Sequence, residues 1–178
     1  LGASSCLLCP SDSNSPIGSS TCNCNTANSY FDTQSGTCIC KAGYSSSFAG
    51  NGSLTCTICQ VGTYSPLGSR SCSSCPANTY SSIGSSSCVQ CSPNSISLPG
   101  SASCDCIAGY RQSGFGGSLL CNSCIEGTFA PASTFFCTAC AANTFAPINS
   151  GSCLACQDNS QSLAGMPSCT CDANFYSK

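Results

Sequence analysis

Residues 59–75 read CQVGTYSPLGSRSCSSC, and residues 75–91 read CPANTYSSIGSSSCVQC. Each stretch begins with a cysteine, carries Thr-Tyr at the fourth and fifth following residues, turns through Gly and Ser, and ends on a CxxC pair. Self-similarity at a short fixed period is the signature of a repeat architecture. The sequence therefore predicts a tandem array of small loops in place of an ordinary globular domain.

The same spacing runs through the whole chain. Its 178 residues contain 22 cysteines, all of them in close CxxC or CxC pairs. The first cysteines of successive pairs are 16 residues apart, except for 18 residues between Cys38 and Cys56 and 17 residues between Cys104 and Cys121. Each repeat is thus one small loop between two cysteine pairs.

A longer period lies over the short one, because KAGYSSSF after Cys40 matches IAGYRQSGF after Cys106. The chain then divides into three blocks: residues 1–55 with two CxC pairs, residues 56–120 with three CxxC pairs and one CxC pair, and residues 121–178 of the same kind. The tail DANFYSK joined to the head LGASS aligns with QVGTYSPLGSRS. We therefore expect the third block to continue in phase into residue 1 of a next unit, joined either by a peptide bond or by end-to-end docking.

Composition indicates the compartment and the classes of partner. Cysteine at about one residue in eight is typical of disulfide scaffolds in oxidising compartments, so we place the chain outside the cell or at its surface. With 4 Lys+Arg against 6 Asp+Glu there is no basic stripe for nucleic acid and no polybasic patch for a lipid surface. We expect neither nucleic-acid binding nor direct membrane contact.

The predicted fold class is a small disulfide-rich tandem repeat. Ser, Gly, Ala and Thr dominate between the cysteines, so crosslinks must replace a conventional hydrophobic core. Thr-Tyr and Thr-Phe favour extended backbone, and Ser-Pro, Leu-Gly and Ile-Gly favour turns. We expect short β-hairpins, almost no helix, an elongated rod of stacked loops, and few contacts beyond nearest neighbours.

The unit CxxC-x-x-(G/N)-T-(Y/F)-(S/A) resembles the ephrin-receptor-like cysteine-rich repeat and the first module of tumour-necrosis-factor-receptor repeats. Residues 104–110, CDCIAGY, and residues 38–44, CICKAGY, are similar to the C-terminal part of an EGF-like domain, without its full six-cysteine pattern. The resemblance implies bonds from the second cysteine of each pair to the first of the next: Cys9–Cys22, Cys24–Cys38, Cys40–Cys56, Cys59–Cys72, Cys75–Cys88, Cys91–Cys104, Cys106–Cys121, Cys124–Cys137, Cys140–Cys153 and Cys156–Cys169. Spacing alone does not fix that connectivity.

This scheme leaves Cys6 and Cys171 over, one near each end of the sequence. Together with the in-phase tail and head, it leads us to expect an inter-unit disulfide from Cys171 of one unit to Cys6 of the next. The expected partner is therefore the chain itself, end to end in a fibre.

The cysteine pairs could also support other chemistry. Two CxxC pairs could hold zinc through four thiolates, and a single CxxC can be a redox motif. The absence of His, the few basic residues and the many uniform copies favour a scaffold. Without His the usual base for a Ser or Cys nucleophile is absent, and the carboxylates are scattered along the chain. We therefore predict no catalytic residue, no metal site and no cofactor.

Asn51-Gly52-Ser53 is a glycosylation sequon in a Gly-rich turn, so we expect a covalent glycan on Asn51. The recurring aromatics (Tyr30, Tyr44, Tyr64, Tyr80, Tyr110, Phe129, Phe145 and Phe175) either pack on their own disulfides or form a stacking surface for sugars or a neighbouring fibre. The predicted function is a structural, glycosylated segment of an extracellular filament, stalk or surface hair. The alternative is the cysteine-rich ectodomain of a receptor or adhesion protein that binds a protein ligand; a metal-storage protein is a third and weaker reading.

Overall fold

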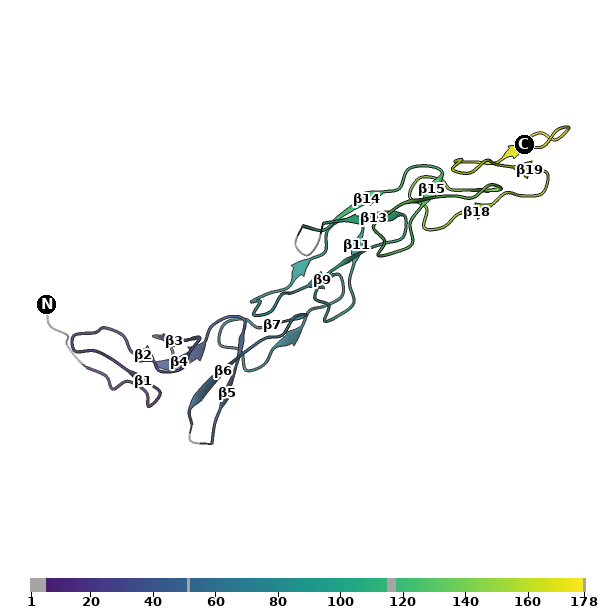
Figure 1. Cartoon of the computed structure of the whole chain (residues 1–178). Helices are drawn as coiled ribbons and strands as arrows, with labels where there is room; N and C mark the ends of the chain where they lie inside the picture. Colours follow the sequence, from purple (N-terminus) through teal and green to yellow (C-terminus); the bar gives the residue numbers. More distant parts are fainter. Residues whose placement is uncertain (1–5, 51, 115–117, 178) are drawn as a thin grey trace. The chain divides into compact units, whose positions relative to one another are not determined.

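The computed structural model describes residues 6–50, 52–114 and 118–177. Within these ranges it contains twenty short strands, which form ten two-stranded sheets, and no α-helix (Figure 1). Ten disulfides follow at regular spacing. The predicted class of disulfide-rich tandem repeat with short β-hairpins is confirmed.

The chain forms two compact units. Unit 1 contains the chain up to Pro76 together with Tyr80–Val89 and Pro99–Ala102, and unit 2 contains Ala77–Thr79, Gln90–Leu98 and the chain from Ser103 onwards. The strands of unit 1 are β1 (Ser13–Asn14) with β2 (Asn23–Cys24), β3 (Ser29–Asp32) with β4 (Thr37–Cys40), β5 (Tyr44–Phe48) with β6 (Leu54–Ile58), and β7 (Thr63–Tyr64) with β8 (Ser73–Ser74).

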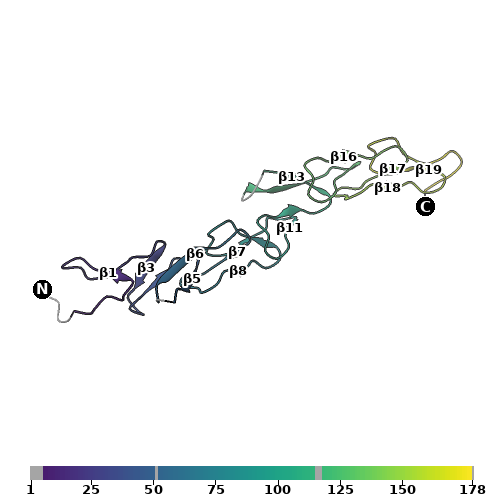
Figure 2. The same cartoon turned by 60° about the horizontal axis from the view of Figure 1, so that its bottom comes forward.

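The next hairpin, β9 (Thr79–Tyr80) with β10 (Val89–Gln90), has residues in both units. The strands of unit 2 are β11 (Ser95–Ile96) with β12 (Asp105–Cys106), β13 (Tyr110–Ser113) with β14 (Leu120–Ser123), β15 (Thr128–Phe129) with β16 (Thr138–Ala139), β17 (Thr144–Phe145) with β18 (Leu154–Ala155), and β19 (Ser160–Gln161) with β20 (Thr170–Cys171). Figure 2 shows the loops of unit 2 from β13 to β19 following one another in chain order.

One register recurs in these hairpins. Thr63 lies opposite Ser74 and Tyr64 opposite Ser73, so the Thr-aromatic dipeptide pairs with the two residues between the cysteines of the next CxxC. The β-favouring Thr-aromatic pair supplies one strand, and the disulfide closes the hairpin beside it. We number loop positions from the second cysteine of a pair, so that Thr63 and Tyr64 are positions 4 and 5 of the loop after Cys59.

Position 3 has a left-handed backbone in both units. Gly62 has φ +75° and Gly127 has φ +76°, whereas Asn78 and Asn143 occupy the same position with φ of 63° and 61°. Glycine adopts this region without steric cost, and asparagine does so more readily than most residues. This explains why position 3 of the repeat is Gly or Asn.

Disulfide-bonded cysteines make up most of the buried apolar residues in the described part of the chain. Cys40, Cys59 and Cys124 have no exposed surface, and the few other buried apolar side chains are Leu and Ala. Leu54 is 3% exposed and packs with Cys38 and Cys40. No helix among the described residues has the length and apolar character needed to span a bilayer.

Loops two apart along the chain touch, and here the expectation of contacts almost confined to nearest neighbours was wrong. A Cβ on Gly62 would lie 1.9 Å from the carbonyl oxygen of Gly100, and one on Gly127 would lie 1.9 Å from that of Gly165. The same approach occurs at Gly43 and Gly109. Because position 3 carries no side chain there, the backbone of the second loop along lies directly against it.

The turn of hairpin β3–β4 supplies a prediction about acid. Asp32 accepts hydrogen bonds from the Ser35 hydroxyl at 2.6 Å and from the Ser35 and Gln34 amides at 3.1 and 3.3 Å. The Ser35 hydroxyl, followed by these amides, lowers the pKa of Asp32 below its ordinary 3.8. Because the pKa of Asp32 is lower in the folded chain, its ionised carboxylate stabilises the folded turn above pH 3.8. That stabilisation is lost as the pH falls through the folded-state pKa.

We expect a carbon-detected NMR titration to give Asp32 a pKa below 3.8 in the native chain and a higher pKa in a Ser35→Ala variant. An unchanged Asp32 titration in Ser35→Ala would contradict this account of the turn.

Candidate functional site

The interface between successive loops is the feature that recurs throughout the molecule. In unit 1 the Gly62 amide donates to the Ser81 carbonyl oxygen at 2.9 Å, and the Gly84 amide donates to the Cys59 carbonyl oxygen at 2.9 Å. The Ser81 hydroxyl donates to the Thr63 carbonyl oxygen at 2.9 Å. Position 3 of one loop thus donates to position 6 of the next, whose side chain donates to position 4. The cysteine before the first loop accepts from position 9 of the next.

The same bonds hold other loops. All three recur from the Cys40 loop to the Cys59 loop in unit 1 and from the Cys140 loop to the Cys156 loop in unit 2. Their donors and acceptors are Gly43 to Ser65, Gly68 to Cys40 and Ser65 to Tyr44, and Asn143 to Ser162, Gly165 to Cys140 and Ser162 to Thr144. Where position 6 is alanine, the two backbone bonds remain: Gly109 to Ala130 with Ser133 to Cys106, and Gly127 to Ala146 with Asn149 to Cys124.

Position 6 lies at the centre of this interface and admits only a small side chain. Ser65, Ser81, Ala130 and Ala146 are completely buried. A buried hydroxyl needs a partner, and the serines find one in the carbonyl of position 4 in the preceding loop. The interface therefore selects for Ser or Ala.

A pair of substitutions at Ser81 tests this packing. Because Ala130 and Ala146 occupy the equivalent position, we expect Ser81→Ala to lower the free energy of unfolding by only about 1 kcal/mol, the net value of one hydrogen bond. Ser81→Leu should cost about 3 kcal/mol or more, because the added carbons meet backbone on both sides. Chemical denaturation followed by circular dichroism measures both, and equal effects would contradict the assignment of position 6 to a tight interface.

Two of the loops that follow a CxC pair, those closed by Cys40–Cys56 and Cys106–Cys121, contact the loop before them through a buried leucine. Leu54 and Leu119 are 3% and 6% exposed, and their carbonyl oxygens accept hydrogen bonds from the hydroxyls of Thr26 at 2.9 Å and Ser92 at 3.0 Å. The longer hairpins β5–β6 and β13–β14 carry these leucines. These two hairpins contain the matching stretches after Cys40 and Cys106 that define the longer sequence period.

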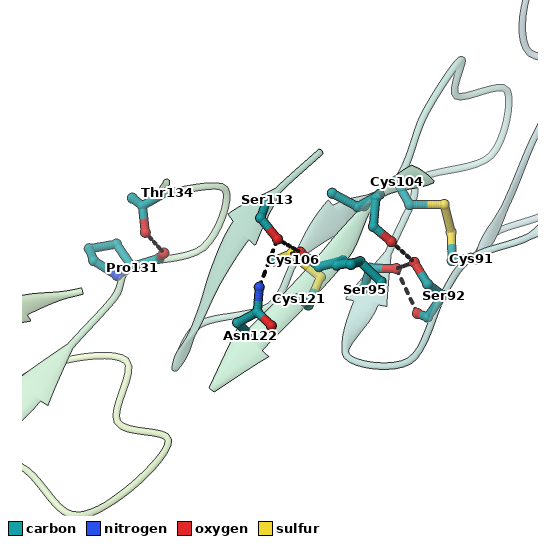
Figure 3. The surroundings of a disulfide bond; sticks show 12 residues. Cys91, Ser92, Ser95, Cys104, Cys106, Ser113, Cys121, Asn122, Pro131 and Thr134 are labelled. Atoms are coloured by element: carbon teal, nitrogen blue, oxygen red, sulfur yellow. Dashed lines mark hydrogen bonds between the residues drawn. A yellow bond between two sulfur atoms is a disulfide. The ribbon is translucent and has the colours of Figure 1, made fainter. Parts of the chain in front are cut away.

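Figure 3 shows the second of these junctions, in unit 2. Ser92 follows the Cys91–Cys104 disulfide and is hydrogen bonded with Ser95. Beyond it, the Asn122 amide donates to the Ser113 hydroxyl at 2.7 Å across hairpin β13–β14. Short polar side chains therefore fill the space beside the disulfides.

The structure joins twenty of the predicted site cysteines in the pairs that the resemblance implies: Cys9–Cys22, Cys24–Cys38, Cys40–Cys56, Cys59–Cys72, Cys75–Cys88, Cys91–Cys104, Cys106–Cys121, Cys124–Cys137, Cys140–Cys153 and Cys156–Cys169. Cys6 and Cys171 are free and exposed. Asn51 lies outside the described residues.

A groove of about 700 Å³ lies beside the free Cys171 thiol in unit 2. Phe145, Leu154, Phe175 and Tyr176 line it. Phe175 is 53% exposed, whereas the recurring aromatics Tyr64, Tyr80, Phe129 and Phe145 are half-buried. The predicted aromatic positions are therefore not equivalent, because the Phe175 side chain is more exposed than these four.

Disulfide-closed hairpins with an interior of cystine define a cysteine-rich repeat domain of a non-catalytic kind, and such domains are secreted or extracellular. Residues 43–81, from hairpin β5–β6 to β9, match the family model described as tyrosine-protein kinase ephrin type A/B receptor-like. These residues are similar to an ephrin-receptor-like cysteine-rich repeat. A comparison of the chain with curated proteins found no match.

Proposed function

We propose that this chain is a structural segment of an extracellular filament, stalk or surface hair, stiffened by serial disulfides. The observation that carries the proposal is the loop interface, which repeats with the same positions bonded at successive steps in each unit. A protein built around one ligand site concentrates distinctive residues in one place. In this chain the bonded positions recur from loop to loop, as expected of a repeat that resists bending along its whole length.

The proposed mechanism is mechanical. A loop is closed by its disulfide and tied to the next by one or two residues between paired cysteines. Two backbone hydrogen bonds then fix neighbouring loops, and the glycine contact at Gly62 or Gly127 fixes loops two apart. Each hydrogen bond contributes only about 1 kcal/mol. Because the disulfides have already restricted each loop, few conformations compete with the stacked one.

Small-angle X-ray scattering of the intact chain tests the proposed stiffness. To keep the protein monomeric, the sample carries Cys6→Ser and Cys171→Ser, which leave all ten disulfides in place. The proposal expects scattering of a thin rod, with a maximum dimension that does not change with salt. A scattering curve typical of a chain bending freely between loops would contradict it.

Glycosylation is part of the proposal. Gly50, Gly52 and Ser53, which flank Asn51 in the sequence, are exposed between strands β5 and β6. A surface with a net charge of -2 has little electrostatic protection from aggregation, and glycans would supply solubility. Mass spectrometry of chain secreted from a eukaryotic host should show a glycan that both Asn51→Gln and Ser53→Ala remove. Unmodified Asn51 in the secreted protein would contradict this part of the proposal.

The alternative function is the ectodomain of a receptor or adhesion protein. The match of residues 43–81 to a receptor-like family model favours it, as do the exposed Leu67 and Ile83 in unit 1. It expects saturable binding of one protein partner that Leu67→Ser with Ile83→Ser weakens. The filament proposal expects no such partner and a rod in the scattering experiment.

A further inference from the structure

Two parts of the chain carry the two halves of a hairpin that the repeat closes elsewhere. In the loops between CxxC pairs, a second cysteine bonds the first cysteine of the next pair, and positions 4 and 5 pair with the two residues between its cysteines. After Cys171, positions 4 and 5 are Phe175 and Tyr176. Between Cys6 and Cys9 the two residues are Leu7 and Leu8.

These groups are the ones the structure leaves exposed. The thiols of Cys6 and Cys171 are free and accessible. Leu7 and Leu8 are 93% and 98% exposed, and Tyr176 is 84% exposed beside the groove described above. Exposed large apolar side chains next to a free thiol are costly for a secreted protein unless a partner covers them.

We propose that the partner is a second copy of this chain, docked head to tail. Leu7 and Leu8 of one copy add a strand beside Phe175 and Tyr176 of the other, and a disulfide joins Cys6 to Cys171. The register follows hairpin β17–β18, where position 4 faces the second inter-cysteine residue, so Phe175 lies opposite Leu8 and Tyr176 opposite Leu7. The inference rests on the proposed filament function, for which it supplies the joint.

The following loop shows the same continuity with the established interface. Position 6 of the Cys9 loop is Ser15, which is exposed although its equivalents Ser65 and Ser81 are fully buried. Position 9 is Gly18, with φ +81° like the other glycines that donate to a preceding cysteine. Among the described residues, the Gly18 amide makes no such bond. In the docked pair it donates to the Cys171 carbonyl oxygen, and Ser15 becomes buried.

The covalent step is a thiol–disulfide exchange with a small disulfide, such as oxidised glutathione, as the oxidant. The Cys171 thiolate attacks one sulfur of that disulfide, and a mixed disulfide forms as one thiol leaves. The Cys6 thiolate of the second copy then attacks the Cys171 sulfur and displaces the second thiol. Two protein thiols are oxidised, one small disulfide is reduced to two thiols, and no other reagent is needed.

The test uses the full chain in a glutathione redox buffer, with two single variants. Cys6→Ser keeps only the Cys171 thiol, and Cys171→Ser keeps only the Cys6 thiol. We expect each variant alone to remain monomeric, their equimolar mixture to form a covalent dimer and nothing longer, and the unsubstituted chain to form a ladder of oligomers. Peptide mapping should identify a Cys6–Cys171 crosslink. Dimers of one variant alone, or a mixture that stays monomeric, would overturn the proposal.

A second comparison separates docking from random oxidation. Leu7→Ser with Leu8→Ser should slow crosslinking about tenfold or more, because the added strand loses its apolar contact with Phe175 and Tyr176. Leu67→Ser, which changes an exposed leucine of the same kind elsewhere, serves as the matched control. Equal rates in both would overturn the docking. The scattering experiment uses monomers without either thiol, so the stiffness proposal and the joint fail independently.

Discussion

Complete reduction of the ten disulfides unfolds the chain under otherwise native conditions. Among the described residues, most of the buried apolar ones are disulfide-bonded cysteines, and many large apolar side chains, such as Ile83 and Ile148, are at least half exposed. Closing one loop of about 15 residues contributes about 3 kcal/mol, and little apolar burial replaces that contribution. Amide NMR spectra should collapse to the narrow dispersion of an unfolded chain after reduction and alkylation.

A paired-cysteine variant localises the same effect. Cys75→Ser with Cys88→Ser removes one disulfide from the interior of unit 1 and should lower the free energy of unfolding of its surroundings by about 3 kcal/mol. The matched control is Cys9→Ser with Cys22→Ser, which opens a loop of the same 13-residue separation at the start of the described residues. The control should disturb fewer amides, because fewer loops contact that loop. Native-like spectra of the reduced chain would contradict the account of a cystine core.

Gly62→Asn lowers the free energy of unfolding by about 3 kcal/mol or more, although asparagine suits the backbone at this position. Asn78 and Asn143 occupy position 3 with the same left-handed backbone, so conformational strain is not the main cost. The cost comes from the Cβ, which would lie 1.9 Å from the Gly100 carbonyl oxygen. Backbone of a loop two steps along must move to admit it.

Gly36→Asn is the control for this prediction. Gly36 has φ +69°, close to that of Gly62, and a Cβ there would meet nothing within 4 Å. We expect its effect to stay below about 1 kcal/mol. Denaturation midpoints of the two variants, measured by circular dichroism, should differ clearly. Equal midpoints would show that loops two apart do not touch in solution.

Much of the local structure was predictable because the repeat is local. The Thr-aromatic pair and the following turn favour a hairpin whatever lies around it, and the spacing of the cysteines sets the size of each loop. The resemblance to ephrin-receptor-like repeats implied the disulfide pairs that the structure contains. Each of these features depends on residues within one loop or between adjacent cysteine pairs.

The features missed from the sequence depend on how loops meet. Gly62 cannot be an asparagine because the backbone of Gly100, two loops further along, lies directly against it. No residue within the Cys59 loop indicates that approach. The burial of Ser81 and of Leu54 likewise depends on neighbouring loops. A signal for the leucine was present, because GSLTC before Cys56 matches GSLLC before Cys121. Aligning position 6 of the loops that follow a CxxC pair would also have shown that only Ser or Ala occurs there.

Amide hydrogen exchange of the oxidised chain, followed by NMR, tests most directly whether the loops are fixed to one another. The account predicts strong protection of the interface amides Gly62, Gly84, Gly127 and Gly165, whose acceptors lie in the next or the preceding loop. Protection at these amides while all ten disulfides are intact would mean that neighbouring loops form one stiff stack. Exchange at the rate of exposed loop amides would mean that the disulfides order each loop separately, and it would contradict the proposed filament segment.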